Sequence, residues 1–126
     1  MLQYLEIFNC NTLVSWPLEF RYLINLIRLS IRKCPNLTGI LPAQVKNKIS
    51  LLPRLQKLEF YECSSLKQVP KCGDDVLDVL ELDECPQVES VSGIDKLDML
   101  YLSCTSWTSF AEWVRKVWYV KDSLGI

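Results

Sequence analysis

Six cysteines are the residues of this sequence with the clearest potential for chemistry, at positions 10, 34, 63, 72, 85 and 104. A thiolate can act as a nucleophile, ligate a metal ion or form a disulfide. The sequence contains no histidine, which excludes Cys-His and Ser-His-Asp nucleophiles and histidine-ligated metals. No two cysteines have the C-x-x-C spacing of a zinc site.

One cysteine has acidic neighbours that could suggest a thiol or hydrolytic site. Cys72 is followed by Gly73, Asp74 and Asp75. No base is available to activate the thiol, and a Gly-Asp-Asp run is typical of a polar turn. We therefore predict that the protein is not an enzyme and has no catalytic, cofactor-binding or metal-binding residues.

Four cysteines recur at one position of a repeated phrase, L-x-x-L-x-Φ-x-x-C-x-x-L, in which Φ is apolar. Copies start near residues 2, 26, 55 and 77, and a fifth, starting near 97, has Thr105 in place of the cysteine. Such regularity indicates a structural ladder of small buried groups, namely Cys10, Cys34, Cys63 and Cys85. Disulfides between stacked strands and a metal site are the alternatives. Cys72 and Cys104 fall outside the ladder and are expected to be free thiols, which favours a reducing compartment.

The phrase requires elements that can repeat and stack. In L-x-L the two leucines point to one side of a short strand and the x residues to the other. Copies spaced by 20 to 29 residues resemble a leucine-rich-repeat array. The resemblance implies an α/β solenoid, part of a horseshoe, with about five parallel strands on its concave face. In the first three copies an apolar residue and a proline follow the last leucine of the phrase, as in Val69-Pro70, whereas the fourth copy has no proline there. Variable segments such as 43–52 are expected to be irregular or short helical returns to the next strand on the convex side.

The two ends of the chain lead to different expectations. Residues 1–106 comprise the five repeats, and the first begins without a polar cap, so we expect the chain to be the tail of a longer array. Residues 107–126 contain Ser109 and Glu112 in the spacing of a capping box, followed by an apolar stripe at helical spacing. We predict a C-terminal amphipathic helix that closes the core.

Charge is unevenly distributed along the chain. Residues 19–57 carry a net charge of +7, residues 59–89 a net charge of −7, and the whole chain −1. A nucleic-acid-binding protein would need a basic surface without an acidic neighbour, so no nucleic acid is expected as a partner. No apolar run approaches the roughly 18 residues of a membrane span, and no membrane association is expected. This polarity suits a protein partner or another domain.

The repeats are similar to the C-terminal repeats of plant intracellular nucleotide-binding leucine-rich-repeat resistance proteins, the coiled-coil type in particular. Residues 55–70 (LQKLEFYECSSLKQVP) and 2–17 (LQYLEIFNCNTLVSWP) show the similarity best. It implies non-catalytic protein recognition in plant defense and innate immunity, with sensing and autoinhibition, in the cytoplasm or nucleus. The implied partners are a pathogen effector, a guarded host protein or an intramolecular switch domain. Nothing here matches the nucleotide-binding module, so ADP or ATP would bind only upstream.

Two other resemblances remain open. Residues 36–42 resemble the N-L-x-G-x-I-P stretch of extracellular plant receptors, and Asn36 lies in a glycosylation sequon. Substrate adaptors of ubiquitin ligases also have cysteine at the ladder position.

The x residues of the five predicted strands are the place to look for a partner-binding surface. The row Phe8, Arg32, Tyr61 and Asp83 mixes aromatic and charged groups, as binding hot spots do. The predicted partner-binding residues on the concave face are Tyr4, Glu6, Phe8, Arg28, Ser30, Arg32, Lys57, Glu59, Tyr61, Glu81, Asp83 and Tyr101, and the x residues Val79, Met99 and Ser103 complete the face.

Overall fold

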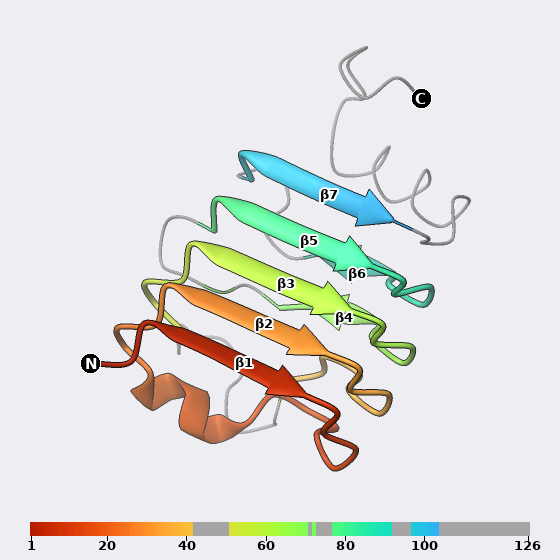
Figure 1. Ribbon diagram of the computed structural model, residues 1–126, viewed down its shortest axis with the longest axis horizontal. Coiled ribbons are helices and arrows are strands. Elements are labelled where there is room, and N and C mark those ends of the chain that lie inside the picture. The colour runs from red at the N-terminus through yellow and green to blue at the C-terminus, as the bar shows by residue number, and fades with distance from the viewer. Residues whose placement is uncertain (42–50, 71, 73–76, 92–96, 104–126) are drawn as a thin grey trace.

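The computed structural model describes residues 1–41, 51–70, 72, 77–91 and 97–103. One parallel sheet is formed by five strands, in the spatial order β1 (Tyr4–Phe8), β2 (Arg28–Arg32), β3 (Lys57–Tyr61), β5 (Val79–Asp83) and β7 (Met99–Ser103). A second parallel pair consists of β4 (Gln68–Val69) and β6 (Ser90–Val91). The strands follow one another along the solenoid (Figure 1), so each stacks on the strand of the preceding repeat. The protein is therefore a parallel β-solenoid.

The register of the sheet follows the repeated phrase residue by residue. Leu5, Leu29, Leu58, Leu80 and Leu100 are aligned across the five strands, and so are the apolar residues two positions later. This alignment confirms that five parallel strands lie at the predicted positions of the repeats. Because side chains alternate along a strand, the same register aligns the x residues on the opposite face.

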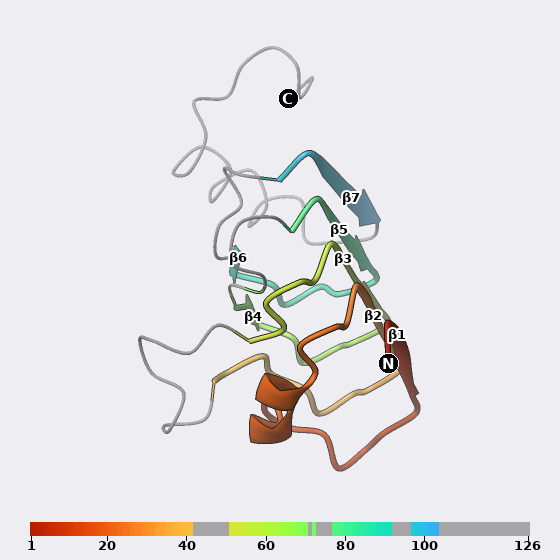
Figure 2. The same cartoon turned by 90° about the vertical axis from the view of Figure 1, so that its left-hand side faces the viewer.

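The core lies behind the sheet and is made of the repeated apolar residues. Leu26, Leu29, Leu55, Leu58 and Leu80 are at most 1% exposed. Trp16 also lies in the core, with its ring edge-to-face to the rings of Phe20 (centroids 5.7 Å apart) and Phe60 (5.9 Å). Figure 2 shows the sheet on one side and β4, β6 and the 3-10 helix Leu18–Tyr22 (η1) on the other. This 3-10 helix is the one helical element among the described residues.

Each of the first four strands of the sheet ends in the same unusual backbone conformation. Asn9, Lys33, Glu62 and Glu84 directly follow β1, β2, β3 and β5, and all have φ between 53° and 57°. Each of their N–H groups donates to the carbonyl of the last residue of the next strand, as Lys33 does to Tyr61 at 2.8 Å. The left-handed turn thus continues the ladder past the strand and directs the chain towards the core cysteine that follows.

A second ladder of backbone hydrogen bonds, on the side opposite the five-stranded sheet, aligns the segments that lead from one strand of that sheet back to the next. We call it the return ladder. Thr38 N donates to Val14 O at 2.9 Å, and Lys67 N donates to Thr38 O at 2.9 Å. Gly39 lies next to this ladder with φ of 83°, and a Cβ atom there would overlap the backbone carbonyl of Gln68. Glycine is therefore required at this position. The β4–β6 pair extends the ladder, and β4 ends directly before Pro70, as expected from the missing N–H.

Cys72 differs from its predicted position. It was expected in a polar turn, but it forms a β-bridge with Leu51 and is only 4% exposed. The polar neighbours in the sequence suggested exposure, whereas stacking on the preceding return buries the side chain. The predicted C-terminal helix, Cys104 and most of the segment 43–52 lie outside the described residues.

Candidate functional site

The candidate site is the outer strand face, which we define as the alternate residues of the five strands whose side chains point away from the core. All the predicted partner-binding residues belong to it, at register positions that run straight across the sheet. In the row of Phe8, the partners in order are Arg32, Tyr61, Asp83 and Ser103. The row of Glu6 continues with Ser30, Glu59, Glu81 and Tyr101.

Burial divides this face into two levels. Tyr4 and Phe8 on β1 and Met99 and Tyr101 on β7 are 45% to 53% exposed. Ser30 and Glu59, in the centre, are 0% and 2% exposed. The structure therefore buries two of the predicted partner-binding residues beneath larger neighbours. They support the surface and do not present their own atoms to a partner.

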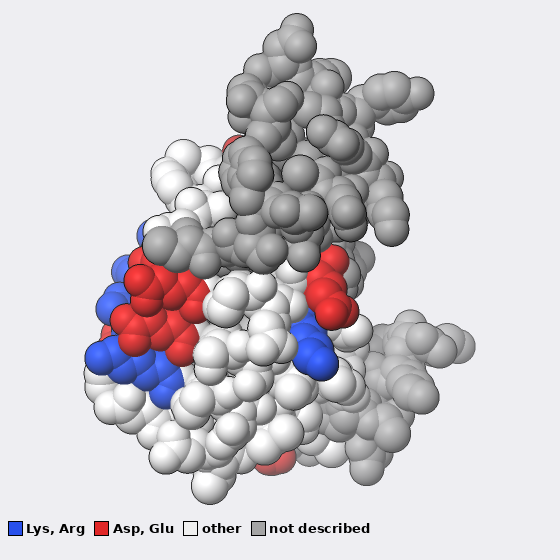
Figure 3. All heavy atoms as spheres, turned by 90° about the vertical axis from the view of Figure 1, so that its right-hand side faces the viewer, with Lys and Arg blue, Asp and Glu red and all other residues white. Residues whose placement is uncertain are grey.

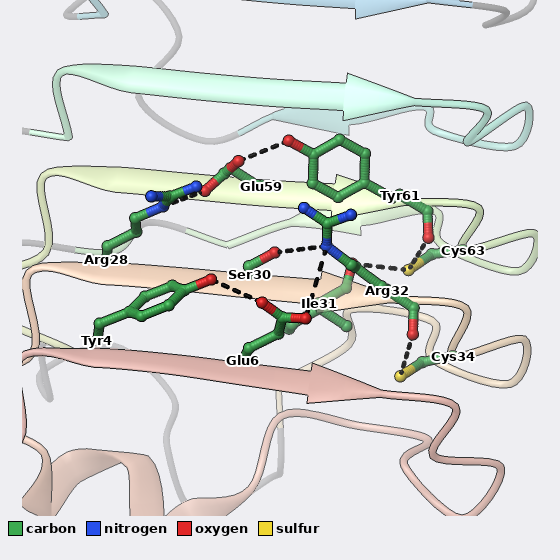
Figure 4. A network of polar contacts seen from close by, with 10 residues as sticks. All are labelled: Tyr4, Glu6, Arg28, Ser30, Ile31, Arg32, Cys34, Glu59, Tyr61 and Cys63. Carbon is green, nitrogen blue, oxygen red and sulfur yellow. Dashed lines mark hydrogen bonds and ion pairs between the residues drawn. The ribbon is translucent and has the colours of Figure 1, made fainter.

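Glu59 is the centre of a hydrogen-bond network (Figure 4). The Nε atom of Arg28 donates to one carboxylate oxygen at 2.5 Å, and the Tyr61 hydroxyl donates to the other at 2.5 Å. Burial alone would raise the pKa of Glu59, but these hydrogen bonds and the charges of Arg28 and Lys57 outweigh it and lower the pKa. A buried carboxylate is thus kept ionised and positions two residues that lie on different strands.

The Tyr61 hydroxyl is held in its neutral form by the same contacts. Burial raises its pKa, and the carboxylates of Glu59 and Glu81 raise it further, because both disfavour a phenolate. The ring is therefore a neutral aromatic platform with a fixed orientation. Near neutral pH, its chemical role is to stack and to donate a hydrogen bond.

Cations stack on aromatic rings at three places on or beside this face. The guanidinium of Arg28 lies 4.9 Å from the centre of the Tyr4 ring, and that of Arg32 lies 4.2 Å from the Tyr61 ring. The ammonium of Lys33 lies 5.7 Å from the Phe8 ring. These distances are within the range of favourable cation–π contacts.

Sequence reasoning missed Lys33, because it is not an x residue of the strand. It directly follows β2, and its left-handed backbone places it beside the outer strand face. The signal that could have found it is its position directly before the ladder cysteine, which is the position shared by Asn9, Glu62 and Glu84.

The uneven charge of the sequence reappears across the face. Arg28, Arg32 and Lys57 lie on β2 and β3, whereas Glu81 and Asp83 lie on β5. The exposed Glu62 and Glu84 follow β3 and β5 directly. Figure 3, which views the ends of the strands, shows acidic side chains gathered at the edge of the sheet with basic side chains beside them. A partner that covers this edge therefore meets both signs of charge.

The ladder cysteines lie at the base of the strand ends. The Cys34, Cys63 and Cys85 side chains are fully buried, and each thiol donates to the carbonyl two residues earlier, at 3.4 to 3.6 Å. The Cys63 and Cys85 thiols also lie 3.7 Å from a carbonyl oxygen of the preceding strand, so the single S–H of each is shared between two acceptors. The five cysteines of the described residues are free thiols. Cys63 and Cys85 thereby link neighbouring repeats through weak hydrogen bonds, whereas the hydrogen bonds of Cys10 and Cys34 lie within their own repeats.

Thiol chemistry has little support at Cys72. Burial raises the pKa of this thiol to about 12, so the nucleophilic thiolate is scarcely populated near neutral pH. Cys10 is the opposite case: a hydrogen bond with Thr12 lowers its pKa, and its side chain is only half-buried. In the described ranges, no three Cys, Asp or Glu side chains are grouped to hold a metal ion. No helix of the described part is long and apolar enough to span a membrane.

Comparison with protein families, with curated proteins and with solved structures found no match to this chain.

Proposed function

We propose that the protein is a non-catalytic recognition module of the leucine-rich-repeat type and that a protein partner binds its outer strand face. The observation that carries the proposal is the network around Glu59. A buried carboxylate orients Arg28 and Tyr61, and Tyr61 in turn supports Arg32. Arginine and tyrosine are enriched in binding hot spots, and side chains that are already ordered lose little entropy on binding.

The size of the face determines how a partner must bind. Five strands about 4.8 Å apart and about 17 Å long present roughly 400 Å². A specific interface uses about 800 Å² per partner. A partner therefore also contacts the residues that follow the strands, where Lys33, Glu62 and Glu84 are exposed. These residues carry the charges that would select and orient the partner.

The biological setting that we propose rests on the resemblance of the repeats to plant intracellular resistance proteins. In that setting the face would bind a pathogen effector, a guarded host protein or a switch domain.

Photocrosslinking in living plant cells tests this proposal. Benzoylphenylalanine at position 101, on the outer strand face, should crosslink to a protein partner. The matched control is the same group at position 22, where Tyr22 is 67% exposed but lies on the 3-10 helix. The product from position 101 should disappear with Arg32→Glu and persist with Arg54→Glu. Equal products from both positions, or products insensitive to Arg32→Glu, would rule out the outer strand face as the binding surface.

A further inference from the structure

The two arginines of β2 differ in how strongly their guanidinium groups are already held by other side chains. Arg28 forms an ion pair with the buried Glu59 carboxylate, and their closest atoms are 2.5 Å apart. Arg32 has only a 3.3 Å contact from its Nε atom to Ser30 Oγ and a 3.9 Å ion pair with Glu6. Both partners of that ion pair are exposed, at 37% and 42%, and such pairs contribute little.

The guanidinium of Arg32 therefore retains donors for a ligand. Within the described part of the chain, its terminal Nη atoms make no hydrogen bond, whereas the Nε atom is held by Ser30. Its central carbon lies over the Tyr61 ring, 4.2 Å from the ring centre, and Tyr61 is fixed through Glu59. A planar donor fork that is already oriented suits bidentate binding of an oxyanion.

The residues beside Arg32 indicate which ligand group would lie next to the bound oxyanion. Phe8 is the register neighbour of Arg32 on β1, is 53% exposed and has the Lys33 ammonium beside its ring. An apolar side chain of a ligand could cover Phe8 while its carboxylate reaches Arg32. In an extended peptide, the side chains of residues i and i+2 project from the same side about 6.6 Å apart. Phe8 and Arg32 lie on neighbouring strands about 4.8 Å apart, so two such side chains could reach both residues.

On the basis of the proposed function, we propose that Arg32 binds a carboxylate side chain of the protein partner, in an extended segment whose residue at i+2 is apolar and packs on Phe8. A monoanion fits better than a phosphate. Glu6 lies 3.9 Å from Arg32, and Asp83 lies in the same row two strands away, so a second negative charge on the ligand would be repelled.

The test uses the full chain labelled with 15N-arginine and short synthetic peptides. The probe is acetyl-Gly-Glu-Gly-Leu-Gly-amide, and the matched peptides replace Glu with Gln or with phosphoserine. The chain has five arginines, so the Nε–Hε signals are few and can be assigned with Arg32→Lys. We expect the Glu peptide to shift the Arg32 signal and to bind about tenfold more tightly than the Gln peptide, because charge-assisted bidentate hydrogen bonds are lost with glutamine.

Variants of three residues test where on the protein the peptide binds. Arg32→Lys retains the charge but lacks the fork and should weaken binding of the Glu peptide. Arg54→Gln is the matched control, because Arg54 is exposed and donates to Asn25 Oδ1 at 3.1 Å, away from the strands of the sheet. It should leave binding unchanged. Phe8→Ala should weaken binding of the Glu-Gly-Leu peptide but not of a Glu-Gly-Gly peptide.

Two results with the unmodified protein would overturn the inference, whether or not a variant folds. One is equal binding of the Glu and Gln peptides, and the other is tighter binding of the phosphoserine peptide. Neither result would remove the photocrosslink from position 101, which reports whether a partner covers the outer strand face and not which group of the partner Arg32 binds. Loss of the crosslink would instead disprove the proposed function itself.

Discussion

Arg28 on β2 holds the carboxylate of Glu59 on β3, although the two residues are 31 positions apart in the sequence. They are diagonal neighbours, because the register pairs Arg28 with Lys57 and Ser30 with Glu59. The small Ser30 side chain leaves room for the Arg28 guanidinium to cross towards β3. An exposed arginine is thereby anchored by an acid that is only 2% exposed.

Replacing Glu59 by glutamine should destabilise the protein. Glutamine has nearly the same shape, but it lacks the negative charge of the carboxylate that accepts hydrogen bonds from Arg28 and Tyr61. A hydrogen bond to a charged group contributes about 1.5–3 kcal/mol, and Arg28 can regain water because it is 42% exposed. We therefore expect the free energy of unfolding in urea to fall by about 1–3 kcal/mol. Glu6→Gln, on the exposed β1, is the control and should change it by less than about 0.5 kcal/mol. A Glu59→Gln value within that range would contradict the role of the network.

The same carboxylate should make stability depend on pH in the acidic range. The pKa of Glu59 is lowered from its ordinary value of 4.5 on folding. Its stabilisation is therefore complete above the ordinary pKa and is lost as the pH falls through the lowered one. We expect the difference in unfolding free energy between the native protein and Glu59→Gln to be constant from about pH 7 to 5 and to shrink below about pH 4.5. A difference that stays constant to about pH 3 would show that folding does not lower the pKa of Glu59.

The cysteines should react with iodoacetamide in an order set by burial and pKa. Cys10 is half-buried and its pKa is lowered by Thr12, whereas burial raises the pKa of Cys34 and, to about 12, that of Cys72. We expect Cys10 to be labelled at least about tenfold faster than Cys34, Cys63, Cys72 and Cys85 in the folded protein at pH 7.5. Peptide mass spectrometry over time measures the order, and the differences should vanish in urea. Fast labelling of Cys72 would reopen the possibility of a thiol site.

Gly39 should tolerate no side chain. Its φ of 83° disfavours residues with a Cβ atom, and that atom would overlap the Gln68 carbonyl in the return ladder. We expect Gly39→Ala to lower the free energy of unfolding by more than about 2 kcal/mol. The neighbouring Ile40 is 51% exposed, so Ile40→Ala should have an effect below about 0.5 kcal/mol. A Gly39→Ala protein as stable as Ile40→Ala would mean that the return ladder can shift without cost.

The sequence allowed the strand positions and their register to be predicted with single-residue accuracy. The reason is that each copy of the phrase has the same spacing between Leu, Leu, Φ and Cys, and a period of two within a strand determines which side chains face the core. The row Phe8, Arg32, Tyr61 and Asp83 follows directly from that register. The partner, the plant setting and the absence of catalysis remain predictions.

The repeated spacing by itself therefore determined that the chain forms a parallel solenoid and which residues share its outer face. Only the tertiary structure decided which of them are accessible and which are bound to one another. Glu59 and Ser30 are buried, Cys72 is buried against Leu51, and Lys33 joins the face. These outcomes depend on diagonal contacts between strands and on the left-handed turn after each strand. Side-chain size and direction across neighbouring repeats set such contacts, and no pattern within a single repeat contains that information.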